Sequence, residues 1–255
     1  MKKIGYVLSG GGVRGVAHLG VIQALNESGI KPDLISGTSA GAIAGAFIAA
    51  GYQPKEIVQI IKDVGIFSFS NILFRKQGIF KMKAFEEIYK KYIPHDSFEN
   101  LKLPLYTTAT DIVKGEPVYF HSGILSKALM ASSCVPVVFE PITIDGKLFL
   151  DGGIVNNLPV EPLIGKCDKI IGVHVNAIST NQADLHMKDL ADRSFHLALS
   201  SAVRLREKNC DLFIEPPEMT KFGIFDMNKI DEVYNYAYHY TLGMKEQIEA
   251  FKKDL

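Results

Sequence analysis

The first fifty residues alternate between short apolar runs and a longer segment in which apolar residues recur with helical spacing. Residues 4–9 and 33–36 are the apolar runs, and each predicts a strand. Residues 14–28 predict a helix, because four apolar residues fall on related faces: Val16, Leu19, Ile22 and Leu25. A second helix, rich in small residues, is expected over 42–50. This order of elements predicts an α/β protein with a mostly parallel sheet flanked by helices.

The rest of the chain continues this alternation. Strands are expected at 104–111, 117–121, 142–150, 169–175 and 211–215, and helices from about 124 to the Ser132-Ser133 pair, at about 187–208 and at about 228–253. Asp145-Gly146 marks a hairpin turn within the third of these strand regions. The 255 residues contain no repeat or linker, so the sequence predicts a single domain over residues 1–255.

The junction between the second strand and the second helix carries the strongest chemical signal. Residues 37–41 read Gly-Thr-Ser-Ala-Gly, a G-x-S-x-G sequence placed between a strand and a helix. In a nucleophile elbow the chain turns sharply at the serine, and the flanking glycines keep the turn free of Cβ clashes. Ser39 is therefore the best candidate for a nucleophile.

Two further segments supply what a serine nucleophile needs. The glycine-rich residues 10–15 follow the first strand and open a helix, so their backbone N–H groups can bind a phosphate or a tetrahedral oxyanion. Asp151 follows the alternating run 148–150 and precedes two glycines, which keep the space around its carboxylate open. Apolar neighbours would raise its pKa and make it a better base.

Together these segments resemble the patatin-like phospholipases, with four blocks in the same order: residues 10–15, 37–41, 131–136 and 151–153. The resemblance implies a three-layer sandwich with the elbow after the second strand, and a serine acyl hydrolase without metal or organic cofactor. It assigns the catalytic dyad to Ser39 and Asp151. It assigns the oxyanion hole to Gly10, Gly11, Gly12, Val13, Arg14 and Gly15, the elbow to Gly37, Thr38, Ala40 and Gly41, and supporting positions to Ser132, Ser133, Pro136, Gly152 and Gly153.

The resemblance leaves the substrate open. Phospholipase A or lysophospholipase activity is the first expectation. A general carboxylesterase or thioesterase acting on small acyl esters, and a lipid-binding protein without activity, are the alternatives. Arg14 could add a guanidinium to the oxyanion hole, or could hold the loop by pairing with a backbone carbonyl.

Two other interpretations of the motifs are weaker. Residues 10–15 match a dinucleotide fingerprint, but Asp33 opens the second strand, whereas a ribose-binding acid would end it. A Ser-Asp-His triad has its histidine candidates after Asp151, namely His174, His186, His196 and His239. In the α/β-hydrolase fold, however, several strands precede the elbow. His18 is expected to pack, or to pair with the backbone near the glycine-rich loop.

Composition limits the classes of partner and the compartment expected for the chain. Lys+Arg and Asp+Glu are balanced at 28 each, so nothing indicates a nucleic acid partner. Three widely spaced cysteines suit a reducing compartment. The apolar run near the N-terminus is too short for a signal peptide, and no run is long enough for a transmembrane helix. A cytoplasmic protein is expected.

Residues 64–85 combine aromatic and basic side chains without an acidic one. Such a segment suits peripheral contact with a membrane, where apolar groups enter the lipid and basic groups meet anionic headgroups. The candidate contacts are Phe67, Phe69, Phe74, Arg75, Lys76 and Phe80. The alternative is a cap helix that packs its phenylalanines on the core.

Overall fold

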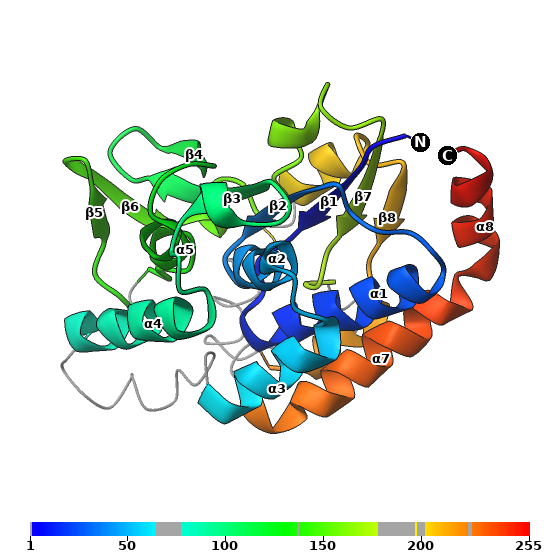
Figure 1. The fold of residues 1–255 in the computed structure, drawn as a ribbon, viewed down its shortest axis with the longest axis horizontal. Coiled ribbons are helices and arrows are strands. Elements are labelled where there is room, and N and C mark those ends of the chain that lie inside the picture. The colour runs from blue at the N-terminus through cyan, green and yellow to red at the C-terminus, as the bar shows by residue number, and fades with distance from the viewer. Residues whose placement is uncertain (1, 65–77, 137, 178–196, 198–201, 224–225) are drawn as a thin grey trace.

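A single mixed sheet organises the chain in the computed structural model, which describes residues 2–64, 78–136, 138–177, 197, 202–223 and 226–255 (Figure 1). The strands are β1 (Ile4–Leu8), β2 (Leu34–Thr38), β3 (Leu105–Asp111), β4 (Glu116–Phe120), β5 (Ile142–Ile144), β6 (Lys147–Asp151), β7 (Lys169–Val173) and β8 (Leu212–Ile214). Their order is β5-β6-β3-β2-β1-β7-β8, and β4 pairs with β3. The five strands from β3 to β8 are parallel, and β4, β5 and β6 add an antiparallel edge.

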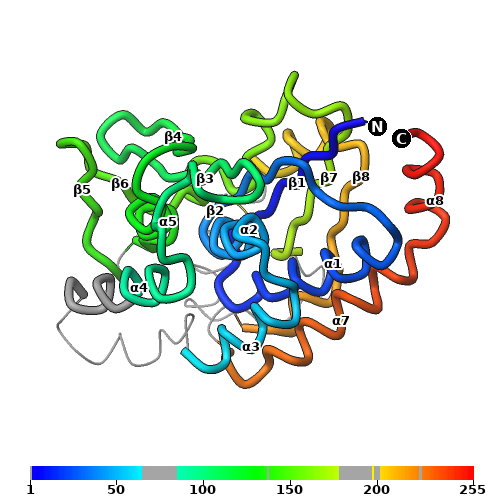
Figure 2. The backbone as a smooth tube through the Cα atoms, viewed as in Figure 1, coloured from blue at the N-terminus to red at the C-terminus, as the bar shows by residue number. Residues whose placement is uncertain are grey.

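Helices pack on the sheet as the sequence predicts for an α/β protein. They are α1 (Val16–Glu27), α2 (Ala40–Ala50), α3 (Pro54–Val64), α4 (Gly78–Tyr92), α5 (Leu125–Ser132), α7 (Ile230–Gly243) and α8 (Lys245–Lys253). In Figure 2, α2 lies at the centre of the molecule, and α1 runs beside α7. Lys2 Nζ donates to the Asp254 carbonyl, so the two ends of the chain lie together.

The sheet separates two apolar layers. On one face, alternate side chains of β1, among them Tyr6 and Leu8, pack with apolar residues of α1, α2, α3 and α7. On the other face, Val7 packs with residues of the segment 158–163 and with Val203, which lies in the helical stretch 202–207. The central strands are therefore buried on both sides, which is why β1 reads as a continuous apolar run and even Ser36 and Thr38 of β2 are fully buried.

The structure corrects several predicted boundaries. The helix expected over 14–28 begins with a 3-10 turn, Gly12–Gly15, and continues as α1. The long helix expected over 228–253 is wrong, because the chain breaks at Met244 into α7 and α8. The Asp145-Gly146 turn is confirmed, with both residues at positive φ. Most of the helix expected at 187–208 lies outside the described residues.

The expected membrane segment 64–85 is only partly described. Phe67, Phe69, Phe74, Arg75 and Lys76 lie outside the described residues, and Phe80 falls in α4, where its side chain is not described. Phe85, at the end of this segment, packs against the core and meets the ring of Phe139 edge to face.

Gly41 shows how closely the first helix after the elbow approaches the sheet. A Cβ built at Gly41 would lie 2.2 Å from the carbonyl oxygen of Leu8. We expect Gly41→Ala to lower the free energy of unfolding by about 3 kcal/mol, because backbone must move to admit the methyl group. Gly243→Ala is the matched control, since nothing lies within 4 Å of its Cβ position, and it should leave stability equal or higher. Equal denaturant midpoints for the two variants would contradict this account.

Candidate active site

Ser39 occupies the turn between β2 and α2 in a strained conformation. Its φ of +53° and ψ of −121° are unusual for a residue with a side chain. The turn is tight because the backbone of Gly37 contacts that of Gly41, where a Cβ on Gly37 would lie 2.6 Å from the Gly41 carbonyl. A Cβ on Gly15 would lie 2.4 Å from that of Ala40, so the glycine-rich loop also packs directly on the elbow.

Ser132 holds the backbone of this turn. Its hydroxyl accepts the Ser39 N–H at 2.8 Å and donates to the Thr108 carbonyl at 2.6 Å, and its side chain is fully buried. Because α5 ends at Ser132, the elbow is tied to a helix about ninety positions further along the chain. The supporting position predicted at Ser132 thus contacts the elbow.

Asp151 reaches Ser39 across β3. Thr38 pairs with Thr108, and the next residue of β3, Ala109, pairs with Asp151, so the ends of β2 and β6 lie at the same level on either side of β3. The carboxylate accepts the Gly153 N–H at 2.8 Å, and the Ser39 side chain lies close enough to it to lower its pKa. A Cβ on Gly152 would lie 2.2 Å from the Thr108 carbonyl oxygen, so the turn after Asp151 packs directly on β3.

Burial dominates the electrostatics of this pair. It raises the pKa of Asp151 to about 6, although the hydrogen bonds from Ser39 and the Gly153 N–H act in the opposite direction. A carboxylate with this pKa is still ionised at neutral pH. It is also a stronger base than an exposed aspartate, whose pKa is near 3.9.

The glycine-rich loop lies directly beside Ser39. A Cβ on Gly10 would lie 3.1 Å from the Ser39 Cβ, and Gly12 has a φ of +57° that favours glycine. Arg14 N–H donates to the Gly11 carbonyl, whereas the Gly12 and Val13 N–H groups take no part in the hydrogen bonds of the described residues. These first N–H groups of the 3-10 turn are the kind of donor that binds an anion.

Several residues that sequence reasoning passed over hold this loop. Asn157 Oδ1 accepts the Gly10 N–H at 3.0 Å, and Asn176 Nδ2 donates to the Gly10 carbonyl at 2.6 Å. In the sequence, the two asparagines at 156–157, shortly after Asp151, were the one feature that could have indicated these contacts. Arg14 Nε donates to the Phe222 carbonyl at 2.7 Å. This contact matches the second role expected for Arg14, which is to hold the loop by pairing with a backbone carbonyl.

His18 pairs with the backbone near the loop, as expected. Its Nε2 lies 2.7 Å from the Ser9 carbonyl, and burial lowers the pKa of His18 to about 4, so the ring is neutral. Since a carbonyl only accepts, Nε2 carries the proton.

Other candidates lie away from Ser39 or have a partner elsewhere. Ser133 Oγ donates back to Leu129 of its own helix, and no polar contact ties Pro136 to the elbow within the described residues. His174 pairs with Glu215 at 2.7 Å, and His239 is exposed. Asp33 accepts the Ile4 N–H, which is a structural role where β1 and β2 begin. His186 and His196 lie outside the described residues.

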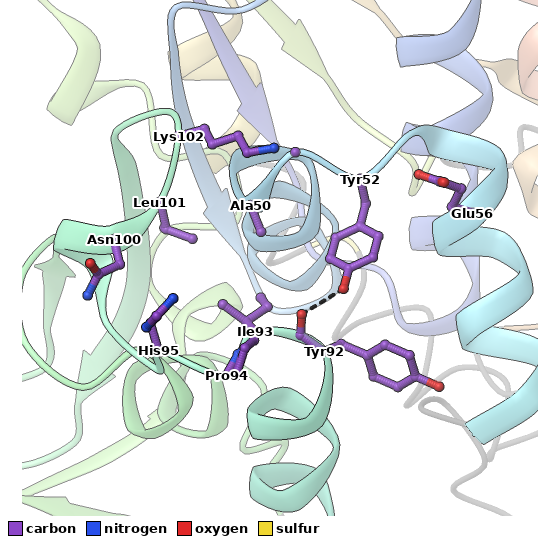
Figure 3. A pocket seen from close by; sticks show the side chains of 11 residues that line it. Ala50, Tyr52, Glu56, Tyr92, Ile93, Pro94, His95, Asn100, Leu101 and Lys102 are labelled. Atoms are coloured by element: carbon purple, nitrogen blue, oxygen red, sulfur yellow. Dashed lines mark hydrogen bonds between the residues drawn. The ribbon is translucent and has the colours of Figure 1, made fainter.

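Two surface hollows in the described part of the chain lie elsewhere. The larger, about 560 Å³, is lined by residues such as Tyr52, Tyr92 and Lys102 around the C-terminal end of α2 (Figure 3). The 11 residues of α2 span about 16 Å, which separates this hollow from Ser39 at the opposite end of the helix. The second, about 370 Å³, adjoins it through Leu101 and Lys102.

The described residues lack both a cluster of metal ligands and a membrane-spanning helix. They contain no group of three His, Cys, Asp or Glu side chains placed to hold a metal ion. Within the same residues, no helix has the length and apolar character that a membrane crossing requires.

The mostly parallel sheet, with a serine elbow after its second strand, defines an α/β protein whose candidate active site lies at the ends of strands. The model of the patatin-like phospholipase family matches residues 6–164, and the chain therefore belongs to that family. An uncharacterized NTE family protein of Mycobacterium bovis is 34% identical over 185 residues, which cover 71% of this chain and 51% of that protein.

Two further relatives extend the comparison. Lysophospholipase nte1 of Aspergillus fumigatus is 28% identical over 283 residues, covering 98% of this chain and 18% of that protein. The crystal structure of VipD from Legionella pneumophila has a TM-score of 0.58 at 17% identity and covers 98% of this chain and 67% of that chain, a likeness of fold. The chain spans about half the length of the mycobacterial relative and a smaller share of the fungal one.

Proposed function

We propose that this chain hydrolyses carboxylic esters of lipids as a phospholipase A or lysophospholipase, with Ser39 as nucleophile and Asp151 as base. The observation that carries the proposal is the placement of Ser39, strained in its elbow, close to the buried carboxylate of Asp151. Family membership supports a lipid ester as substrate, and the fungal lysophospholipase among the relatives supports the same class.

The reaction follows from these positions in two steps. Ser39 Oγ attacks the ester carbonyl carbon while Asp151 takes its proton, and the resulting oxyanion is stabilised by the free N–H groups of Gly12 and Val13. Collapse of this intermediate expels the alcohol, which receives the proton from Asp151 and leaves an acyl group on Ser39. Water then attacks the acyl-enzyme with Asp151 again as base, and the fatty acid is released.

The glycine-rich loop must supply much of the rate. Each donor in an oxyanion hole is typically worth about 10²–10³ in kcat. Two or more donors in one loop therefore offset the absence of a histidine between Ser39 and Asp151. The Arg14 side chain holds the loop through Phe222 and Asn176.

Three substrates and one covalent probe test the proposal. Wild-type protein is incubated with a lysophospholipid, a mixed-acyl phospholipid and a short p-nitrophenyl ester, and a fluorophosphonate probe is mapped to its modified residue by mass spectrometry. The proposal expects modification at Ser39 and faster release of fatty acid from the lipids than from the short ester. Modification elsewhere would overturn the mechanism, and faster turnover of the short ester would favour a general carboxylesterase.

The pKa of Asp151 sets the pH dependence. Because the base must be ionised, kcat/KM should fall below about pH 6 and drop about tenfold per pH unit well below that point. The measurement is kcat/KM on the p-nitrophenyl ester from pH 4 to 8, with the fraction folded followed by circular dichroism at each pH. A profile that stays flat down to pH 4.5 in folded protein would exclude Asp151 as the base.

A further inference from the structure

Asn157 lies where the glycine-rich loop meets the turn after Asp151. The residue is buried, and its Oδ1 accepts the Gly10 N–H at 3.0 Å. A Cβ built on Gly10 would lie 2.6 Å from this oxygen, and one built on Gly153 would lie 3.1 Å from it. One side-chain oxygen therefore packs between both loops, and a side chain on Gly10 would displace it.

The bond from Asn157 fixes one of two successive peptide planes. The Gly10 N–H belongs to the same plane as the Ser9 carbonyl, which His18 holds at 2.7 Å. The Gly10 carbonyl belongs to the next plane, where Asn176 Nδ2 donates to it at 2.6 Å. Since the Gly11 N–H points opposite to the Gly10 carbonyl within that plane, these contacts set the direction in which the following donors point.

The chemistry of position 157 requires a neutral acceptor. An aspartate there would still accept the Gly10 N–H, but it would place a second carboxylate near Asp151, whose Oδ1 lies 3.0 Å from the same Cβ position of Gly153. Like charges this close raise one pKa of the pair. An asparagine supplies the acceptor without the charge.

We propose that Asn157 is a positioning residue that holds the glycine-rich loop in its place relative to Asp151. This inference rests on the proposed function of Ser39 and Asp151. The neighbouring Asn156 provides a comparison, because it is also buried but its side chain bonds to Tyr119 and Glu161.

Three variants test the role of Asn157: Asn157→Ala, Asn157→Asp and Asn156→Ala. Loss of the Gly10 contact in Asn157→Ala should lower kcat by about 10- to 100-fold with KM within about threefold, because misplacing a catalytic group by about 1 Å can cost 10²-fold. Asn157→Asp, of nearly the same shape, should move the acid limb of kcat/KM upward by about one pH unit. Asn156→Ala should lower the melting temperature without moving that limb.

The outcomes separate the two proposals. If wild-type protein neither turns over esters nor reacts with the fluorophosphonate at Ser39, the proposed function fails and the inference with it. If wild-type protein is active and a folded Asn157→Ala variant keeps the wild-type kcat, Asn157 only packs and the inference is overturned. Should Asn157→Ala fail to fold, Asn157→Leu replaces it, because leucine fills similar space without an acceptor for the Gly10 N–H. A lower kcat in Asn157→Leu with kcat retained in Asn157→Asp above its acid limb supports the inference, and wild-type kcat in Asn157→Leu overturns it.

Discussion

Ser39→Ala should reduce ester hydrolysis by about 10⁴-fold or more, because the nucleophile cannot be replaced by any other group at the elbow. The matched control is Ser36→Ala, on the same strand. The Ser36 hydroxyl is buried and has no hydrogen-bond partner in the described residues, so its removal should leave turnover within about twofold and stability equal or higher. The measurement is the initial rate on a lysophospholipid and on a p-nitrophenyl ester.

Comparison of the Ser39 and Ser36 variants distinguishes loss of the nucleophile from damage to the fold. Loss of turnover in Ser39→Ala with an unchanged circular dichroism spectrum assigns the nucleophile. Wild-type turnover in Ser39→Ala would place the nucleophile elsewhere. Equal loss in both variants would point to damage of β2 rather than to chemistry at Ser39.

Asp151→Asn should have two effects of opposite sign. Turnover should fall by about 10³-fold, because the amide cannot take the Ser39 proton. The free energy of unfolding at pH 7 should rise by up to about 3 kcal/mol, because burial raises the Asp151 pKa from 3.8 to about 6 and an ionised buried carboxylate destabilises the folded chain. The amide can still accept the Gly153 N–H.

The sign of the pH dependence gives a second test of Asp151. The folded chain takes up the Asp151 proton at a higher pH than the unfolded chain does, so the wild-type penalty is full above about pH 6 and disappears toward pH 4. The gap in melting temperature between Asp151→Asn and wild type should therefore narrow from pH 7 to pH 4.5. Asp111→Asn is the control: this buried carboxylate also ends a strand, but it accepts the N–H groups of Val113 and Lys114 in the next turn. Asp111→Asn should keep turnover within about threefold. A difference in melting temperature between Asp151→Asn and wild type that widens in acid would contradict the raised pKa of Asp151.

The parts of the site that short sequence segments encode could be predicted. The elbow at Ser39 and the loop before α1 each depend on glycines within a few positions of a strand end, so their sequence carries their geometry. The α/β class followed from the same region, because β1 and β2 read as short apolar runs separated by a helix. The family resemblance added the partner, Asp151, which no local pattern links to Ser39.

The contacts that hold the site could not be predicted in the same way. Ser132 was expected only to shape the site, yet it accepts the Ser39 N–H, and Asn176 reaches Gly10 from more than 160 positions away. Contacts of this kind depend on strand order, which a single sequence does not determine. The break between α7 and α8 was missed because the apolar spacing continues across Met244, although Gly243 stands beside it.

The packing of α1 on α7 has a consequence for the timing of biosynthesis. Gly20 lets the two helix backbones touch, since a Cβ there would lie 2.3 Å from the Tyr234 carbonyl (Figure 2). Arg14 likewise takes its carbonyl partner from Phe222. A nascent chain that has released Ser39 and Asp151 from the ribosome still lacks both supports for the helix that begins at the glycine-rich loop. Since domains generally fold as units, we expect the loop to take its final position only once α7 has been made.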